Sequence, residues 1–326
     1  MLIVGTSLDP HIDRVIERLP SALGIVRFDV DRFPRDQSLS ISIDGETVNI
    51  FVDGKAVAGP GLGPSVGWFR RLGRPGLDPN LDKKFERFAL AEASHTLEAF
   101  TTLLAPRQWI NDYWATRRAS LKPLQYALAA KVGLSVPPTI FSSSKPEVMA
   151  WLSQRPEVVA KTISSPVVFD EDDERGFSFT HVVSEADREN LEDVGVTPVQ
   201  MQELIEPAFE VRLMSILGQH VAVRIDADRS VSEGVRDWRS ERVATRYSWF
   251  ELPSSIEQAT MQLLEELNLD YAASDFIVDR NGRFHFLEAN PHGAWLWLED
   301  ALGEARFTTL FAQAIVDNIS EEKLYN

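Results

Sequence analysis

The sequence predicts a mixed α/β protein built from two or more domains. Its 326 residues are enough for about two domains of roughly 100–200 residues each. Hydrophobic residues make up 44% of the chain and charged residues 25%, as in soluble globular proteins. Short alternating segments typical of strands are interspersed with segments of helical period. These observations exclude a disordered, collagen-like or coiled-coil protein.

The first 112 residues are expected to form an α/β module. Asp44-Gly45 lies between two alternating runs, which predicts a β-hairpin with a primed turn whose two residues have positive φ. A second such pair, Asp53-Gly54, extends the meander. In chain order, the expected elements are a strand at 2–4, a helix at 9–19, a strand at 25–28, hairpin strands at 39–43 and 48–52, and a helix at 81–104.

The rest of the chain continues as two further α/β parts, 113–202 and 203–326. A helix at 119–132 stops at Gly133, as expected of a C-cap residue. The elements expected after it are strands near 139–141 and 158–162, a helix at 145–153, strands at 177–183 and 199–205, a helix starting near 184, strands at 209–217 and 220–226, a helix at 254–267, a hairpin at 271–290 and a last helix from about 306.

The charge balance limits the classes of partner. Acidic residues number 49 against 33 basic ones, giving a net charge of −16. Such a surface repels nucleic-acid phosphates and anionic lipid, so we expect neither nucleic acid nor a membrane as partner. The apolar run at the N-terminus is too short for a signal peptide, and no stretch of about 18 apolar residues could span a bilayer. The sequence therefore predicts a cytoplasmic protein.

Cysteine is absent, and six histidines remain. This composition excludes disulfides, thiolate metal sites and cysteine nucleophiles together. The histidines lack the spacings typical of zinc motifs, so a zinc site is not expected.

The most informative segment is a hairpin near the C-terminus. Asn281-Gly282 between two alternating runs predicts a two-residue turn. Counting outward from that turn places Ile277 opposite Phe286 and Asp275 opposite Glu288. Two carboxylates are therefore expected to face each other.

Side-chain alternation assigns these acids to a face of the hairpin. Glu288 is expected to share its face with Phe284, Phe286 and Asn290, and so to lie on a buried, mostly apolar face. Opposed carboxylates destabilise such a site, and a divalent cation would remove the conflict. Two carboxylates and an amide are oxygen donors that suit Mg²⁺ better than zinc. The alternative is a hairpin whose acids point to solvent.

Several cationic residues fit a nucleotide site. Lys122 opens a helix and Lys161 ends the apolar strand 158–161. A lysine that ends an apolar strand can face an internal anion, and the alternative is the usual solvated lysine. Glu210 and Arg212, two residues apart on a strand, project to one side. Glu210 can accept from sugar hydroxyls while Arg212 neutralises phosphate, although an isolated pair of this kind is common.

The order of these features resembles the ATP-grasp superfamily over residues 115 to 326. The resemblance implies ATP and two Mg²⁺ ions as cofactors. In chain order, its elements are Lys122, Lys161, Gln202-Glu203-Leu204-Ile205, Glu210-x-Arg212, Asp275 and Glu288-x-Asn290-Pro291.

The same resemblance implies a role for each of these residues. Lys161 and Arg212 would stabilise the transferring phosphoryl group, and so act in catalysis. The implied contacts are Lys122, Lys161 and Arg212 with phosphates, the segment from Gln202 through Glu203, Leu204 and Ile205 with adenine, Glu210 with ribose, and Asp275, Glu288 and Asn290 with the magnesium ions.

Over nearly its whole length the chain looks like the ATP-grasp maturases that make microviridins and other graspetides. That resemblance implies a pre-ATP-grasp-like domain at 1–112, a central lid domain at 113–202 and a C-terminal domain with the metal site at 203–326. It also implies a ribosomal precursor peptide, with leader and core, as partner, and a homodimer. The similar segments are Gly67-Trp68-Phe69-Arg70-Arg71, Trp109-Ile110-Asn111, Lys122-Pro123-Leu124-Gln125, Val136-Pro137-Pro138-Thr139, Asp237-Trp238-Arg239 and Glu288 to Gly293 with Trp295 and Trp297.

The implied reaction is ATP-dependent ligation. An Asp or Glu side chain of the precursor would be phosphorylated and then attacked by a Ser or Thr hydroxyl or a Lys amine, giving an ester or an amide. We expect Arg239, within Asp237-Trp238-Arg239, to hold the substrate carboxylate, and Arg224 and Arg246 are the next candidates. The alternative for each arginine is a surface salt bridge.

Two other functions remain open from the sequence. One is a ligase that adds free amino acids to a protein C-terminus or to a small-molecule carboxylate, and the other is a non-catalytic nucleotide-binding protein. The five acids at 170–174 also allow two interpretations, a solvated loop or a lid that recruits a basic leader segment.

Overall fold

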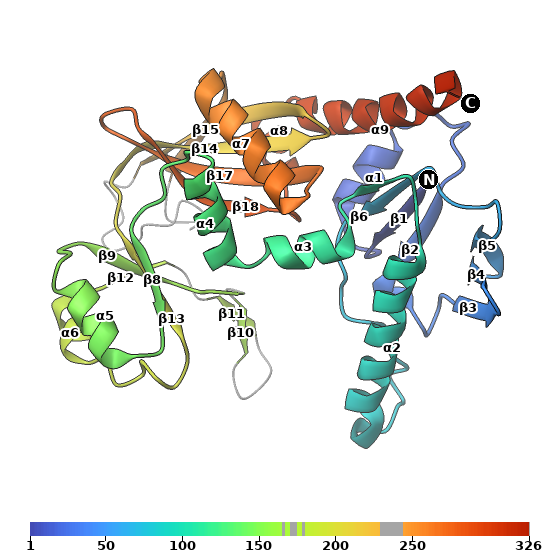
Figure 1. Cartoon of the computed structure of the whole chain (residues 1–326), viewed down its shortest axis with the longest axis horizontal. Helices are drawn as coiled ribbons and strands as arrows, with labels where there is room; N and C mark the ends of the chain where they lie inside the picture. The colour runs from blue at the N-terminus through green and yellow to red at the C-terminus, as the bar shows by residue number, and fades with distance from the viewer. Residues whose placement is uncertain (165–166, 170–174, 178–179, 229–243, 326) are drawn as a thin grey trace.

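The computed structural model describes residues 1–164, 167–169, 175–177, 180–228 and 244–325. It is a mixed α/β protein, as predicted. Figure 1 shows three parts: an N-terminal module, a five-stranded sheet flanked by helices, and a central lobe that α3 and α4 separate from the N-terminal module.

The N-terminal module contains a parallel sheet in the order β2-β1-β6-β7 and a separate antiparallel sheet in the order β3-β4-β5. Buried apolar strands at the centre of the parallel sheet carry its core. The elements are β1 (Leu2–Gly5), α1 (Pro10–Ile16), β2 (Val26–Asp29), β3 (Leu39–Asp44), β4 (Thr47–Val52), β5 (Lys55–Ala58), β6 (Val66–Phe69), α2 (Lys83–Leu103) and β7 (Gln108–Ile110).

One of the two predicted turns in this module is shifted. Asp53 and Gly54 both have positive φ, 50° and 74°, as a primed turn requires. In the first hairpin Asp44 still pairs with Thr47 in the ladder, so the turn residues are Gly45 and Glu46. The prediction of Asp44-Gly45 as the turn pair is therefore wrong by one residue.

Two helices connect this module to the central lobe, α3 (Tyr113–Ala119) and α4 (Lys122–Lys131). Both pack on the C-terminal sheet, because Ala119, Tyr126 and Ala129 belong to its buried cluster. The lobe has its own small core and an antiparallel sheet in the order β12-β9-β13-β8. Its elements are β8 (Thr139–Ser142), α5 (Lys145–Leu152), β9 (Val158–Lys161), β10 (Val167–Phe169), β11 (Arg175–Phe177), β12 (His181–Val182), α6 (Glu185–Glu189) and β13 (Val199–Glu203).

The C-terminal sheet is antiparallel, in the order β16-β15-β14-β17-β18. One face packs on α4 and α7, and part of the other packs on the C-terminal helices. The elements are β14 (Pro207–Ile216), β15 (Gln219–Asp228), β16 (Ala244–Phe250), α7 (Ser254–Leu267), β17 (Tyr271–Asp279), β18 (Phe284–Asn290), α8 (Leu296–Leu302) and α9 (Arg306–Tyr325).

A single hydrophobic core joins the N-terminal module to the C-terminal sheet. Its buried cluster includes Ile12 and Trp68 from the module, Tyr271 from β17, and Phe311 from α9. The rings of Trp68 and Phe311 lie 4.8 Å apart between centroids. Figure 1 shows α9 lying beside α1, so the end of the chain returns to the first module.

Two predicted features lie outside the described residues. These are the acidic loop 170–174 and the segment Asp237-Trp238-Arg239. Among the helices that the structure describes, none has the length and apolarity needed to cross a membrane.

Candidate active site

The site begins on the central strands of the C-terminal sheet. Arg212 of β14 pairs with Asp275 of β17, and Glu210 pairs with Ile277 two positions away. Because side chains on a strand alternate, Glu210 and Arg212 share one face with Asp275. All three are at most 8% exposed. The alternation predicted for Glu210 and Arg212 is confirmed.

Arg212 and Asp275 form a buried ion pair. Nη1 of Arg212 lies 3.3 Å from Oδ1 of Asp275, and the two side chains are 6% and 11% exposed. The guanidinium lies over the ring of Trp297, 5.8 Å from its centroid. A Cβ on Gly293 would come within 2.2 Å of the Ala273 side chain, so only glycine fits beside this pair without rearrangement.

The structure confirms that Asp275 stands opposite Glu288. The route to that register differs from the prediction. Asp279 and Arg283 close a three-residue turn in which Gly282 has a φ of 78°, in place of the expected two-residue turn. The inner pairs are therefore shifted by one, and Ile277 faces His285.

A β-bulge then restores the predicted pairing. Phe276 pairs with Phe286 and Asp275 with Glu288, so Leu287 is an extra residue on β18. The bulge reverses which face the following residues occupy. The prediction that Glu288 shares its face with Phe284 and Phe286 is therefore wrong.

The two faces of this hairpin have different characters. Phe276 and Phe286 lie in the buried cluster under α4 and α7, whereas Glu288 lies with Asp275 on the other face. Asn290, opposite Ala273, also belongs to the acidic face. Two carboxylates and one amide thus gather on one half-buried surface. Among the described residues, no group of three or more His, Cys, Asp and Glu side chains is placed to hold a metal ion.

The side chains of the two predicted lysines are held next to strand β9 of the central lobe. Nζ of Lys122, at the start of α4, donates to the Thr162 carbonyl at 2.7 Å, just beyond β9. Nζ of Lys161, the last residue of β9, donates to Oε1 of Gln202 on β13 at 2.6 Å. Nε2 of Gln202 lies 3.3 Å from the Tyr126 hydroxyl on α4. These bonds bring Lys122, Lys161 and Gln202 together at the end of β9.

The chain then passes from the lobe to β14 through the segment predicted to bind adenine. The Glu203 amide donates to the Pro138 carbonyl at 2.9 Å, and the Leu204 amide donates to the Glu157 carbonyl at 3.0 Å. The Glu203 carboxylate lies 3.7 Å from Nε of Arg155. These two amides are thus already engaged within the protein.

Arg224 and Arg246 are not brought to this site. Arg224 pairs with Val211 on β14, and Arg246 pairs with Asp226, so both alternate to the face opposite Arg212 and Asp275. Arg224 donates to Asp226 at 2.7 Å and stacks on Phe209 with its guanidinium carbon 3.9 Å from the ring centroid. The salt bridge to Asp226 and the contact with the Phe209 ring hold the Arg224 side chain on that face.

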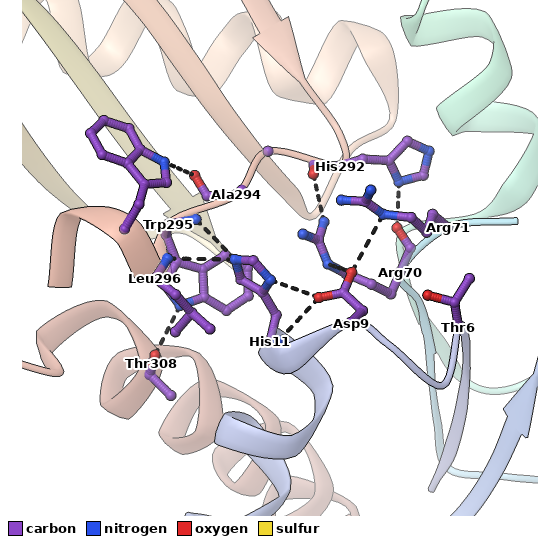
Figure 2. Close-up of polar contacts among 12 residues, drawn as sticks. Thr6, Asp9, His11, Arg70, Arg71, His292, Ala294, Trp295, Leu296 and Thr308 are labelled. Carbon is purple, nitrogen blue, oxygen red and sulfur yellow. Dashed lines mark hydrogen bonds and ion pairs between the residues drawn. The ribbon is translucent and has the colours of Figure 1, made fainter. Parts of the chain in front are cut away.

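A buried ionic cluster that the sequence did not predict lies at the start of α1 (Figure 2). Asp9, at the N-cap of α1, accepts from Nδ1 of His11 at 2.7 Å and lies 3.1 Å from Nε of Arg70. The Trp295 amide donates to Nε2 of His11 at 3.1 Å. Arg71 also reaches Asp9, at 3.4 Å, but its side chain is 44% exposed.

This cluster joins the N-terminal module to the segment after Asn290. Nη1 of Arg70 donates to the His292 carbonyl at 2.6 Å, and Nδ1 of His292 donates back to the Arg70 carbonyl (Figure 2). Burial, together with the positive charge of Arg70, lowers the pKa of His292 to about 4. His292 is therefore neutral near pH 7.

Other buried side chains hold the neighbouring main chain. Nδ2 of Asn111 donates to the Tyr271 carbonyl at 2.8 Å and lies 3.4 Å from the Pro291 carbonyl. The Tyr271 hydroxyl donates to the Gly293 carbonyl. The sequence offered one signal for these residues, because Arg70 and Asn111 both lie in the segments that carry the family resemblance.

A cavity of about 590 Å³ lies away from this site. It opens between the β14–β15 turn, α7 and α9, and none of the predicted site residues lines it.

Arg212, Asp275 and Glu288 share one face of the C-terminal sheet, and Lys122 and Lys161 are held at the end of β9, so the residues of the predicted ATP-grasp set fall into two groups. A family model described as the MvdD pre-ATP grasp domain matches residues 1–117. No curated protein matches the sequence.

Solved structures match nearly the whole chain. The macrocyclase MdnC from Microcystis aeruginosa MRC, bound with precursor peptide MdnA, is 25% identical with a TM-score of 0.82, and the match covers 97% of this chain and 99% of that one. A RiPP-associated ATP-grasp ligase from Chryseobacterium gregarium, in complex with ADP and a leader and core peptide, is 25% identical with a TM-score of 0.84, covering 97% and 96%.

A third structure, the ATP-grasp ligase PsnB complexed with minimal precursor, Mg and ADP, is 22% identical. Its TM-score is 0.75, and the match covers 97% of this chain and 96% of that one. Together these matches confirm the ATP-grasp fold and the predicted resemblance to ATP-grasp peptide maturases.

Proposed function

We propose that this chain is an ATP-dependent ligase that activates Asp or Glu side chains of a ribosomal precursor peptide and cross-links them to other side chains. The observation that carries the proposal is the convergence of Arg212, Asp275 and Glu288 on one face of the C-terminal sheet, with Lys122 and Lys161 held together at the end of β9. Two of the similar structures were solved with a precursor or leader and core peptide, and one of these also contains ADP. This supports a peptide and an adenine nucleotide as the molecules on which this chain acts.

The nucleotide would lie between the lobe and the sheet. Lys122, Lys161 and Arg212 would contact its phosphates, and Glu210 its ribose. The segment 202–205 would contact adenine through groups other than the Glu203 and Leu204 amides, because those two already donate within the protein.

Asp275, Glu288 and Asn290 would hold magnesium, and we propose two ions. The donor set fits, because all three side chains offer oxygen to one surface and Mg²⁺ prefers oxygen ligands. When bound, magnesium neutralises charge on the phosphates. The PsnB ligase, which has the same fold, was solved in complex with both Mg and ADP.

The reaction proceeds in two displacements. The substrate carboxylate attacks the γ-phosphorus of ATP, so an acyl phosphate forms and ADP leaves. A Ser or Thr hydroxyl, or a Lys amine, then attacks the acyl carbon and releases phosphate and a proton, giving an ester or an amide. Lys161 and Arg212 stabilise the transferring group by position and charge. Arg239 remains the first candidate to hold the substrate carboxylate.

The quaternary state and location extend this proposal. We expect a homodimer, as the family resemblance implies, and a cytoplasmic location, as the sequence predicts. Light scattering of the purified chain tests the first point, and a monomeric mass at micromolar concentration would contradict it.

The function is tested by incubating the protein with ATP, Mg²⁺ and a candidate precursor peptide rich in Thr, Ser, Glu and Asp. Each ring formed lowers the peptide mass by one water molecule, with one ADP released per ring. Glu288→Gln should abolish both changes. Addition of whole residues to an acceptor would identify an amino-acid ligase, and nucleotide binding without peptide-dependent ADP release would identify a non-catalytic protein.

A further inference from the structure

The side chain of Gln125 is buried against the strand that carries the proposed metal ligands. It lies on α4, one turn after Lys122, and is 3% exposed. Oε1 accepts from the Ala289 amide at 2.8 Å, and Nε2 donates to the Ala289 carbonyl at 3.0 Å. Nε2 also donates to the Ala119 carbonyl at the end of α3.

These bonds complete the outer edge of β18. In the described sheet this strand is the last, beside β17, so its other edge presents main-chain donors and acceptors that need partners. The Gln125 amide supplies one acceptor and one donor to a single residue, as a neighbouring strand would. Nearby, the main chain covers the same edge at Phe286, whose amide donates to the Ser135 carbonyl at 2.7 Å.

Ala289 stands between the two ligands that β18 contributes. Its own side chain is fully buried in the core under α4, so Glu288 and Asn290 project to the opposite face. Fixing the Ala289 peptide therefore fixes the direction of both ligands. The strand needs this support here, because the Leu287 bulge interrupts the ladder directly before Glu288.

We propose that Gln125 is a positioning residue for the metal site, and that it sets Glu288 and Asn290 relative to Lys122 on the same helix. This inference rests on the proposed function, because it takes these residues as metal ligands. Replacing a residue that orients a metal ligand typically lowers metal affinity or activity 10- to 100-fold, and we expect about this effect here.

The chain offers a matched control in Gln37. This glutamine is 7% exposed and makes the same kind of contact to the edge strand β2. Its Oε1 accepts from the Asp29 amide at 2.7 Å, and its Nε2 donates to the Arg27 carbonyl at 3.2 Å. Replacing Gln37 removes similar bonds in the N-terminal module, away from the metal ligands.

The test measures Mn²⁺ binding in the presence of ADP by electron paramagnetic resonance, and ADP binding without metal by calorimetry. For Gln125→Leu we expect the Mn²⁺ dissociation constant to rise about 10- to 100-fold, with metal-free ADP affinity unchanged. Gln37→Leu should leave both constants at the wild-type values. A purely structural role of Gln125 would weaken both ligands together or neither.

A second variant keeps the inference testable if Gln125→Leu does not fold. Gln125→Asn keeps the amide but shortens the side chain by one carbon, so it should also weaken Mn²⁺ binding. Wild-type Mn²⁺ affinity in either folded variant would overturn the inference. If Glu288→Gln also binds Mn²⁺ like the wild type, the metal assignment of the proposed function fails instead.

Discussion

The candidate site residues lie on two regions with very different cores, the C-terminal sheet and the central lobe. Arg212, Asp275 and Glu288 lie on a sheet that packs large buried clusters on its two faces. Lys161 lies on the central lobe, whose described core is one cluster of seven buried residues. Because local stability follows buried apolar contact, the lobe should open at a lower free energy than the sheet. We therefore expect the lobe to move more readily than the sheet.

The sharpest test of this contrast compares Arg212→Met with Lys161→Met. Both should lower ADP formation about 10²- to 10³-fold, because each removes a charge that we propose stabilises the transferring phosphate. Their effects on stability should differ. Arg212→Met removes the buried cation beside Asp275 and should cost about 3–5 kcal/mol, whereas Lys161→Met removes the hydrogen bond to Gln202 and should cost about 1 kcal/mol. Urea unfolding measures both, and equal losses would remove the contrast between the two regions.

Loss of a buried charge at the junction between the N-terminal module and the sheet should destabilise the protein as much as loss of one within the sheet. Arg70→Met removes the cation beside Asp9 and the donor to the His292 carbonyl, and should cost about 3–5 kcal/mol. Arg71→Met is the control, because its half-exposed side chain reaches the same carboxylate and should contribute about 1 kcal/mol or less. Thermal unfolding that is equally affected by the two changes would show that burial of Arg70 is unimportant.

The region of the C-terminal sheet also contains a buried carboxyl group, that of Asp270, which destabilises the folded protein near neutral pH. Burial, offset in part by the hydrogen bond from Gln108, raises the pKa of Asp270 to about 6. The folded protein favours the neutral form of Asp270. The contribution of this group to the free energy of unfolding is therefore fully present below pH 4 and is lost as the pH rises through about 6. Asp270→Asn should therefore raise the unfolding free energy by up to about 3 kcal/mol at pH 7.5 and have little effect at pH 4. Equal effects at both values would contradict this pKa.

The smallest effect on stability and activity is expected at the contact between α4 and the central lobe. The Tyr126 hydroxyl on α4 accepts from the side-chain amides of Gln200 and Gln202 in the lobe, at 3.2 and 3.3 Å. Tyr126→Phe removes both contacts and should cost about 1 kcal/mol. We expect KM for ATP to rise at most about fivefold with kcat unchanged. Steady-state kinetics at saturating peptide measures both, and a fall in kcat alone would place Tyr126 in the chemistry.

The sequence predicted the opposed carboxylates, although not their surroundings. Asp275 faces Glu288 because two departures from the expected hairpin cancel, one extra residue in the turn and Leu287 in the bulge. Neither departure has a clear signal in the sequence. The faces of the hairpin were therefore assigned wrongly while the pair itself was right.

Sequence patterns fail most where side chains contact distant main chain. Gln125, Asn111 and Arg70 support residues 289 to 292 from segments more than 150 positions away. Local periodicity carries no information about such contacts. The same limit explains Arg224, because its face depends on the register with β14, which alternation alone does not fix.

The return of α9 to the first module has a consequence for chimaeras between relatives. A cut near residue 112 looks natural in the sequence, but it would separate Trp68 from Phe311 and split one core between two parents. A graft of residues 1–112 should therefore fold only when α9 comes from the same parent. In engineering terms the exchangeable unit is discontinuous, made of the beginning and the end of the chain.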